Sequence, residues 1–216
     1  SGSPAINHTE KPMDFAFLNS ILQSTHFPPE DPWFSGHPIS YYYFGHLIMA
    51  TLAKVTFTPP AIAYNISISL IPALLAIGSC GLIYNLIRLS NNTRKSSLIY
   101  SLIGPALLLF MSNLQVPLEI AHTRGWLEPG LWNWAQIKGL DGINNSSSGF
   151  FPTDTWWWWR ATRVIDSIQA GQSLDYTITE FPFFSLLLGD LHPHLMSIPF
   201  VLMFLSLILN FFVAPI

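Results

Sequence analysis

The chain has 216 residues, of which 50% are hydrophobic and 10% are charged, whereas an ordinary soluble domain carries roughly 25% charged residues. The formal net charge of −3 gives no basic surface, which excludes nucleic acid as an expected partner. The single cysteine, Cys80, has no second sulfur with which to form a disulfide. The composition therefore predicts a membrane protein.

The first 60 residues are polar and rich in proline, and we expect a loop beside the membrane that contains short helices. A helix is predicted over 13–23, with apolar residues at helical spacing on one side. Asp14 lies on that apolar stripe, where an ionised carboxylate is costly unless it faces a polar cavity or a partner. The segment 39–57 is apolar but contains Lys54, so we expect an interfacial or partly inserted helix rather than a full span.

A run of three tyrosines, Tyr41 to Tyr43, precedes His46 in that segment. These residues bring hydroxyls and an imidazole to the level of the lipid headgroups, with Tyr42 and His46 one helical turn apart. Tyr42, Tyr43 and His46 are therefore candidate substrate-binding residues. An aromatic belt at the membrane interface explains the tyrosines about as well.

Three long windows without Asp, Glu, Lys or Arg follow along the chain. A spanning helix needs about 20 apolar residues to cross a hydrocarbon core of about 30 Å, and each window supplies them. We expect transmembrane helices over 62–87, 97–114 and 195–215. Because the chain has no initiator Met and stops in or just beyond an apolar run, we expect a fragment of a longer protein.

Basic residues set the predicted orientation of these spans. Arg88, Arg94 and Lys95 cluster in the short connection between the first two spans, and the positive-inside rule places such a connection in the cytoplasm. Residues 1–60 and 115–193 then form two long loops on the extracytoplasmic face of the plasma membrane.

The second loop is rich in tryptophan, with four in a row at 156–159, a residue type that prefers the membrane interface. Arg160 and Arg163 follow, and they share a face if 157–168 is helical. Guanidinium groups beside interfacial aromatic rings are well suited to hold a lipid phosphate. Both arginines are thus candidate substrate-binding residues, and ordinary anchoring to headgroups is the alternative.

Three polar side chains lie within five residues at the outer mouth of the last span: Asp190, His192 and His194. Oxygen and nitrogen donors this close can bind a divalent cation, for which we expect Mg²⁺ or Mn²⁺. Glu180 would add a second carboxylate if the short apolar segment after it folds back. The alternatives are helix capping with bound interfacial water for the three residues, and a solvated loop acid for Glu180.

Several distinctive motifs are distributed along the chain, namely Pro12 to Asn19 (PMDFAFLN), Phe27 to Pro29 (FPP), Asp31 to Trp33 (DPW), Tyr41 to His46 (YYYFGH), Glu180 to Phe184 (EFPFF) and Leu188 to His194 (LGDLHPH). They resemble an uncharacterised membrane protein family named for its YYY signature and found in Chloroflexus-type bacteria and archaea. That family is distantly similar to the GT-C glycosyltransferases, multispan enzymes that use lipid-linked sugar donors.

The resemblance and the spans together predict an all-α fold, a GT-C-like polytopic membrane helix bundle with interfacial helices in its outer loops. Along the chain we expect a first outer loop (1–60), two transmembrane helices joined by a short cytoplasmic loop (61–114), a Trp-rich second outer loop (115–193) and a last transmembrane helix (194–216).

The resemblance also implies a function, the transfer of a sugar from a polyprenyl-phosphate-linked donor on the outer membrane face, with membrane lipid and the lipid-linked sugar as partners. Asp14 would act as general base on an acceptor hydroxyl, while Asp190 and His192, directly or through a metal, would offset charge on the departing phosphate. Arg160 and Arg163 would hold that phosphate.

One departure from the GT-C pattern is that no clear Asp-x-Asp or Asp-Glu pair occurs, which puts a metal requirement in question. Two alternatives to the transferase share the same residues. One is a non-catalytic lipid-binding scaffold or transporter, and the other is a metal-dependent hydrolase that acts on a lipid headgroup.

Overall fold

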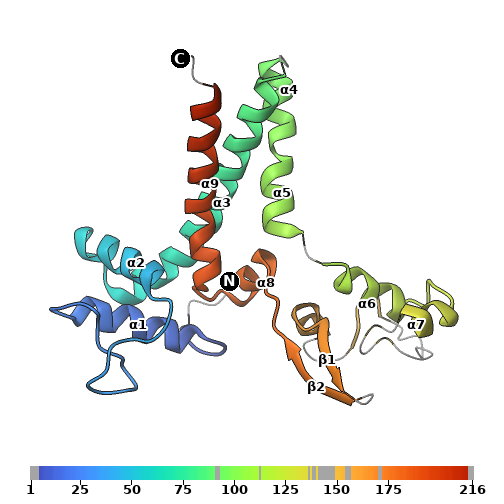
Figure 1. The fold of residues 1–216 in the computed structure, drawn as a ribbon, viewed down its shortest axis with the longest axis horizontal. Coiled ribbons are helices and arrows are strands. Elements are labelled where there is room, and N and C mark those ends of the chain that lie inside the picture. The colour runs from blue at the N-terminus through green and yellow to red at the C-terminus, as the bar shows by residue number, and fades with distance from the viewer. Residues whose placement is uncertain are drawn as a thin grey trace. The chain divides into compact units, whose positions relative to one another are not determined.

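The computed structural model describes residues 5–90, 93–111, 113–135, 137, 140, 149–153, 157–169 and 172–213 (Figure 1). Trp156, the first of the four consecutive tryptophans, lies outside these residues. The elements in chain order are α1 (Lys11–Gln23), α2 (Phe44–Val55), α3 (Pro60–Arg88), α4 (Arg94–Ser101), α5 (Ile103–Phe110), α6 (Gln115–Thr123), α7 (Pro129–Ala135), the 3₁₀ helix η1 (Trp157–Thr162), β1 (Ile165–Gln169), β2 (Gln172–Thr177), α8 (Pro182–Leu188) and α9 (Pro193–Val213).

The chain divides into two compact units. The first unit consists of Ser1–Met111 and Ser185–Ile216, and the second of Ser112–Phe184. The predicted first loop and the predicted spans thus belong largely to the first unit, and most of the predicted loop 115–193 forms the second. A mainly helical fold is confirmed, with one short β-hairpin that the sequence did not predict.

Two helices of the first unit, α3 and α9, are long and apolar enough to cross a membrane. They have 29 and 21 residues, or about 43 and 31 Å at 1.5 Å per residue. These helices coincide with the spans predicted over 62–87 and 195–215. They also pack against each other, α3 meeting α9 through Gly78 and Leu202.

The span predicted over 97–114 is two short helices, α4 and α5, that meet at Leu102. Pro105 has no N–H with which to bond the carbonyl four residues earlier, which explains why the helix is interrupted just before it. By length and composition this segment counts as a third crossing only if it is joined to α6.

The packing between α3 and α5 is close because both helices carry small residues where they meet. A Cβ atom added at Gly104 would lie 2.8 Å from the carbonyl oxygen of Ser79. The Ser79 hydroxyl is turned back onto its own helix and donates to the carbonyl of Leu75 at 2.6 Å. The contact therefore depends on the missing side chain at Gly104.

The core of the first unit joins the predicted first loop to the spanning helices. α1 and α2 pack against each other and against α3, and α2 also meets α9. With 12 residues, α2 is only about 18 Å long and too short to span a membrane by itself. The buried residues of this core are Phe17, Leu18, Ile21, Ile39, Met49, Ala50, Tyr64, Ile71, Leu75, Leu191, Leu195 and Met196.

The second unit contains α6, α7, η1 and the antiparallel hairpin β1–β2, whose register shifts between Ser167 and Ile168. The helix considered over 157–168 is not formed, because η1 ends at Thr162 and β1 begins at Ile165. The β-branched pair Val164-Ile165 favours an extended chain at this point, which accounts for the change. The Asn113 amide donates to the Ala161 carbonyl at 2.5 Å and joins the start of this unit to η1.

Candidate functional site

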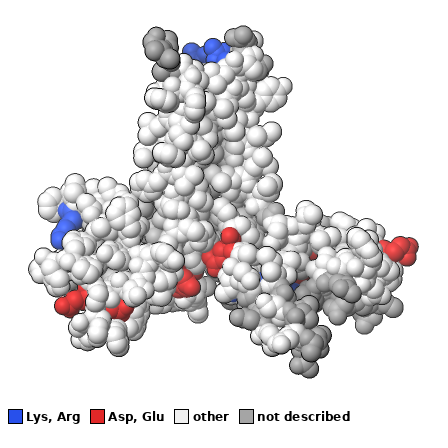
Figure 2. All heavy atoms as spheres, in the orientation of Figure 1, with Lys and Arg blue, Asp and Glu red and all other residues white. Residues whose placement is uncertain are grey.

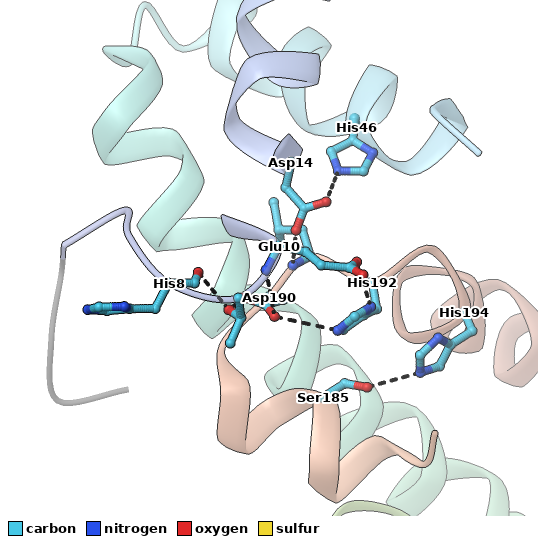
Figure 3. A network of polar contacts seen from close by, with 10 residues as sticks. His8, Glu10, Asp14, His46, Ser185, Asp190, His192 and His194 are labelled. Atoms are coloured by element: carbon cyan, nitrogen blue, oxygen red, sulfur yellow. Dashed lines mark hydrogen bonds and ion pairs between the residues drawn. The ribbon is translucent and has the colours of Figure 1, made fainter. Parts of the chain in front are cut away.

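Two of the sequence-predicted residues, Asp14 and His46, form a buried pair between α1 and α2 (Figure 3). Asp14 Oδ1 lies 3.3 Å from His46 Nε2, and the two side chains are 1% and 0% exposed. The other carboxylate oxygen, Oδ2, accepts a hydrogen bond of 3.0 Å from the backbone N–H of Leu191. Asp14 therefore ties α1 both to α2 and to the segment that precedes α9.

Asp190 lies next to that contact and is bound by the turn that precedes α1. The Thr9 hydroxyl donates to Asp190 Oδ1 at 2.6 Å, and the Glu10 backbone N–H approaches Oδ2 at 3.5 Å. His8 and Thr9 both have positive φ angles, 63° and 52°, which are uncommon for residues other than glycine. A strained turn is thus held in place where it supplies donors to a buried carboxylate, and such strain clusters at functional sites.

His192 lies between two carboxylates, one buried and one accessible (Figure 3). Its Nε2 is 3.6 Å from Asp190 Oδ2, and its Nδ1 is 3.6 Å from Glu10 Oε2. The Asp190 side chain is fully buried, whereas Glu10 is 48% exposed. The imidazole consequently links an interior carboxylate with one that water and ligands can reach.

His194 is placed differently from His192, although their rings stack at a centroid distance of 5.4 Å. It is exposed, and its Nε2 lies 3.0 Å from the Ser185 hydroxyl. Pro193 begins α9 between the two histidines, as its fixed φ angle favours. The start of α9 thus separates an inward-facing imidazole from an outward-facing one.

The tyrosine motif does not form one surface with His46. The predicted helical turn between Tyr42 and His46 is wrong, because α2 begins at Phe44 with Tyr43 as its N-cap residue. Tyr42 is 76% exposed, Tyr43 is partly buried and His46 is fully buried. His46 packs edge-on against Phe17 instead, at a centroid distance of 6.0 Å.

Arg160, Arg163 and Glu180 belong to the second unit, and the two arginines have partners within it. Arg160 forms a two-pronged ion pair with Glu119, in which Nε and Nη2 lie 2.5 and 2.6 Å from the carboxylate oxygens. The Arg163 guanidinium lies 3.9 Å from the centroid of the Trp159 ring. Glu180 is partly buried. The arginine–aromatic contact predicted in this loop is present at Arg163.

Sequence reasoning missed three polar residues at or beside this site: Thr9, Glu10 and Tyr64. Glu10 carried a signal, because it precedes Asp14 by one helical turn. Tyr64 carried a weaker one, a polar aromatic residue near the start of a predicted span, and it is fully buried within the electrostatic influence of Asp14 and Asp190. No sequence signal indicated Thr9, since its contact with Asp190 depends on the turn at His8 and Thr9.

The fold and this cluster define a membrane protein in which carboxylates and imidazoles from the N-terminal helices meet the start of a membrane-capable helix. We call the cluster, consisting of Glu10, Asp14, His46, Asp190 and His192, the polar centre. Such groups can exchange protons and can bind cations.

The chain belongs to the family described as "Uncharacterized membrane protein (DUF2298)", whose model matches residues 1–215. No curated protein and no solved structure matches the chain.

Proposed function

We propose that this protein is a membrane-bound glycosyltransferase that moves a sugar from a polyprenyl-phosphate-linked donor to an acceptor hydroxyl. The observation that carries the proposal is the His192 imidazole set between the buried Asp190 and the accessible Glu10. Burying two carboxylates and two imidazoles is costly unless they are paired or used. Their position before α9, a membrane-capable helix, suits a substrate whose reacting end lies at the headgroup level.

The chemistry needs one proton acceptor and one group that stabilises the leaving phosphate. The acceptor oxygen would lose its proton to a base and form a bond to the anomeric carbon, while the bond from that carbon to the phosphate oxygen breaks. Polyprenyl phosphate would then leave with the bonding electrons. An imidazole that passes a proton toward a carboxylate is a suitable base near neutral pH.

The geometry favours His192, with Asp190 behind it, as this base. Asp14 is 1% exposed and already accepts a hydrogen bond from Leu191. His192 is also buried, at 6% exposed, but its Nδ1 faces Glu10, which is 48% exposed, so an acceptor sugar would approach it from the Glu10 side. We therefore assign Asp14 and His46 a positioning role, in which they fix the 190–192 segment. Tyr42, which is exposed, remains a candidate for stacking against a sugar ring.

A divalent cation at Asp190 and His192 is the alternative to proton transfer by His192, because an imidazole nitrogen that binds a metal cannot also carry the proton. Asp190 and His192 offer oxygen and nitrogen donors, a set that suits Mn²⁺ better than Mg²⁺. Glu10 beside Nδ1 would then orient the His192 ring from its far side, as carboxylates commonly do behind metal-bound histidines. His194, whose ring stacks on that of His192, stays a candidate ligand.

The proposed setting is the plasma membrane, with residues 1–60 and 115–193 on the extracytoplasmic face. The cluster Arg88, Arg94 and Lys95 supports this orientation through the positive-inside rule. Arg160 and Arg163 stay the proposed phosphate-binding residues, with Arg160 paired with Glu119 and the Arg163 guanidinium lying 3.9 Å from the centroid of the Trp159 ring.

The direct test uses proteoliposomes with the full-length protein and a panel of labelled sugars on polyprenyl phosphate. We expect transfer from at least one donor, and a fall of at least about 100-fold in Asp190→Asn, the usual scale for losing acid–base catalysis. Glu30→Gln, which changes an exposed carboxylate that also faces a histidine, should keep full activity.

Three other outcomes would change the proposed function or its mechanism. No transfer over the whole panel by folded protein would reject the transferase and favour a lipid-binding scaffold or transporter. Release of free sugar or headgroup to water would indicate the hydrolase. Loss of transfer on chelation, with recovery on adding Mn²⁺, would support the cation.

A further inference from the structure

A groove of about 640 Å³ lies between α3 and the α4–α5 pair, away from the polar centre. This volume is within the roughly 300–1,000 Å³ typical of small-molecule sites. It is lined from α3 and from α4–α5 by Ala76, Ile77, Cys80, Gly81, Tyr84, Asn85, Arg94, Leu98, Leu102 and Pro105.

The groove is open beside three small residues of its α3 wall, Ala76, Cys80 and Gly81. A Cβ atom added at Gly81 would meet no atom within 4 Å, whereas one added at Gly104 would strike the Ser79 carbonyl at 2.8 Å. The helices are thus closely packed along one side and separated along the other. The Cys80 thiol, 3.2 Å from the Ser101 hydroxyl, lies at the boundary between the two sides.

The lining changes from apolar to polar along the helices. Ala76 and Ile77 lie deepest on α3, and Tyr84 and Asn85 lie about 12 Å further toward its end, at 1.5 Å per residue. The antiparallel partner repeats this order, with Leu102 deep and Arg94 at the end. An amphiphile with one charged end matches this gradient.

The polar end of the groove carries the positive charge of Arg94, and no acidic residue lies near it in the sequence. No Asp or Glu occurs between Asp31 and Glu119, whereas Arg88, Arg94 and Lys95 all lie in that stretch. Figure 2 shows Lys and Arg atoms where α3 ends and α4 begins, and no Asp or Glu atoms there on this face. Arg94 is also the first residue of α4, where the helix dipole adds positive potential.

We propose that this groove binds one phospholipid with an anionic headgroup, whose phosphate lies at Arg94 and whose acyl chain runs past Gly81 toward Ala76. The guanidinium binds phosphate through two parallel hydrogen bonds. Tyr84 and Asn85 supply further polar contacts at the same level. This site is independent of the sugar-transfer proposal, and each can fail without the other.

The test is native mass spectrometry of the full-length protein titrated with phosphatidylglycerol or phosphatidylcholine. Arg94→Gln should weaken phosphatidylglycerol binding about fivefold, the effect of one basic residue at an anionic lipid surface. It should weaken phosphatidylcholine binding less, because the choline cation already offsets the charge of that phosphate. Gly81→Leu, which fills the groove, should abolish the tight binding of both lipids. Arg94→Lys should restore part of the preference.

Two matched variants control for charge and bulk away from the groove. Lys54→Gln removes an exposed basic residue on α2, and Ala61→Leu adds the same side chain to an exposed position in the first turn of α3. Both should bind lipid as the unmodified protein does, and circular dichroism should show equal helix content in all variants.

Two results would overturn the proposal. Equal phosphatidylglycerol binding by Arg94→Gln, Gly81→Leu and the two controls would show that only the general lipid shell is present. Dissociation of a dimer by Gly81→Leu, with lipid binding unchanged, would show that a second copy of the chain occupies the groove.

Discussion

Replacing Asp14 with alanine tests whether the polar centre holds the first unit together. The substitution removes the carboxylate that lies 3.3 Å from His46 and accepts the Leu191 N–H at 3.0 Å. Leaving a buried polar group without its partner costs about 1–3 kcal/mol, and Asp14 has two such partners, the Leu191 N–H and the His46 imidazole. We expect a loss of about 2–5 kcal/mol in the free energy of unfolding.

The assay is reversible unfolding of the full-length protein in mixed detergent micelles, followed by far-UV circular dichroism. Asp14→Asn keeps an oxygen for the Leu191 N–H and should lose clearly less stability than Asp14→Ala. The matched control is Glu30→Ala, which breaks a carboxylate–histidine pair of 4.0 Å whose side chains are both more than 60% exposed, and it should cost less than about 1 kcal/mol. An equal loss in Asp14→Ala and Glu30→Ala would refute the buried pair.

Three further predictions concern other parts of the chain. Arg160→Gln leaves Glu119, 2% exposed, without its cation and should destabilise the second unit by about 3 kcal/mol, seen as faster amide exchange in that unit. The control Arg124→Gln loses an exposed contact with Phe150 and should cost less than about 1 kcal/mol, so equal exchange in the two variants would contradict the prediction. Gly104→Ala should lower the thermal midpoint because its Cβ meets the Ser79 carbonyl, while Gly81→Ala should hold or raise it; a lower midpoint in Gly81→Ala alone would be the opposite result. In a Cys80→Ala background, cysteines at Asp31 and Ser90 should react with an impermeant thiol reagent from opposite sides of sealed vesicles, and labelling from the same side would reject the proposed orientation.

The long apolar helices could be predicted from sequence because their signal is local. Twenty or more apolar residues without a charge are sufficient to place α3 and α9, and the observed bounds differ from the predicted ones by at most two residues. The interruption before Pro105 was also readable, since proline cannot complete the helical hydrogen-bond pattern. Hydropathy alone does not respond to a missing N–H, so it predicts one continuous span over 97–114.

The site could be predicted only in part, because most of its contacts join residues that are far apart in the sequence. Asp14 was flagged by the cost of a carboxylate on an apolar stripe, and the structure gives it two partners far away in sequence. The pairing of Arg160 with Glu119, 41 residues apart, left no trace in local sequence, and neither did the contact of Thr9 with Asp190. Contacts of this kind depend on how helices are packed, which a single sequence does not encode locally.

Proton transfer by His192 is tested most directly by the sugar-transfer rate of His192→Gln beside that of His37→Gln, which changes an exposed histidine stacked on Phe34. We expect a loss of at least about 100-fold in the first variant and none in the second, with both proteins folded and the loss accompanied by a changed pH profile. Full activity of folded His192→Gln would contradict it.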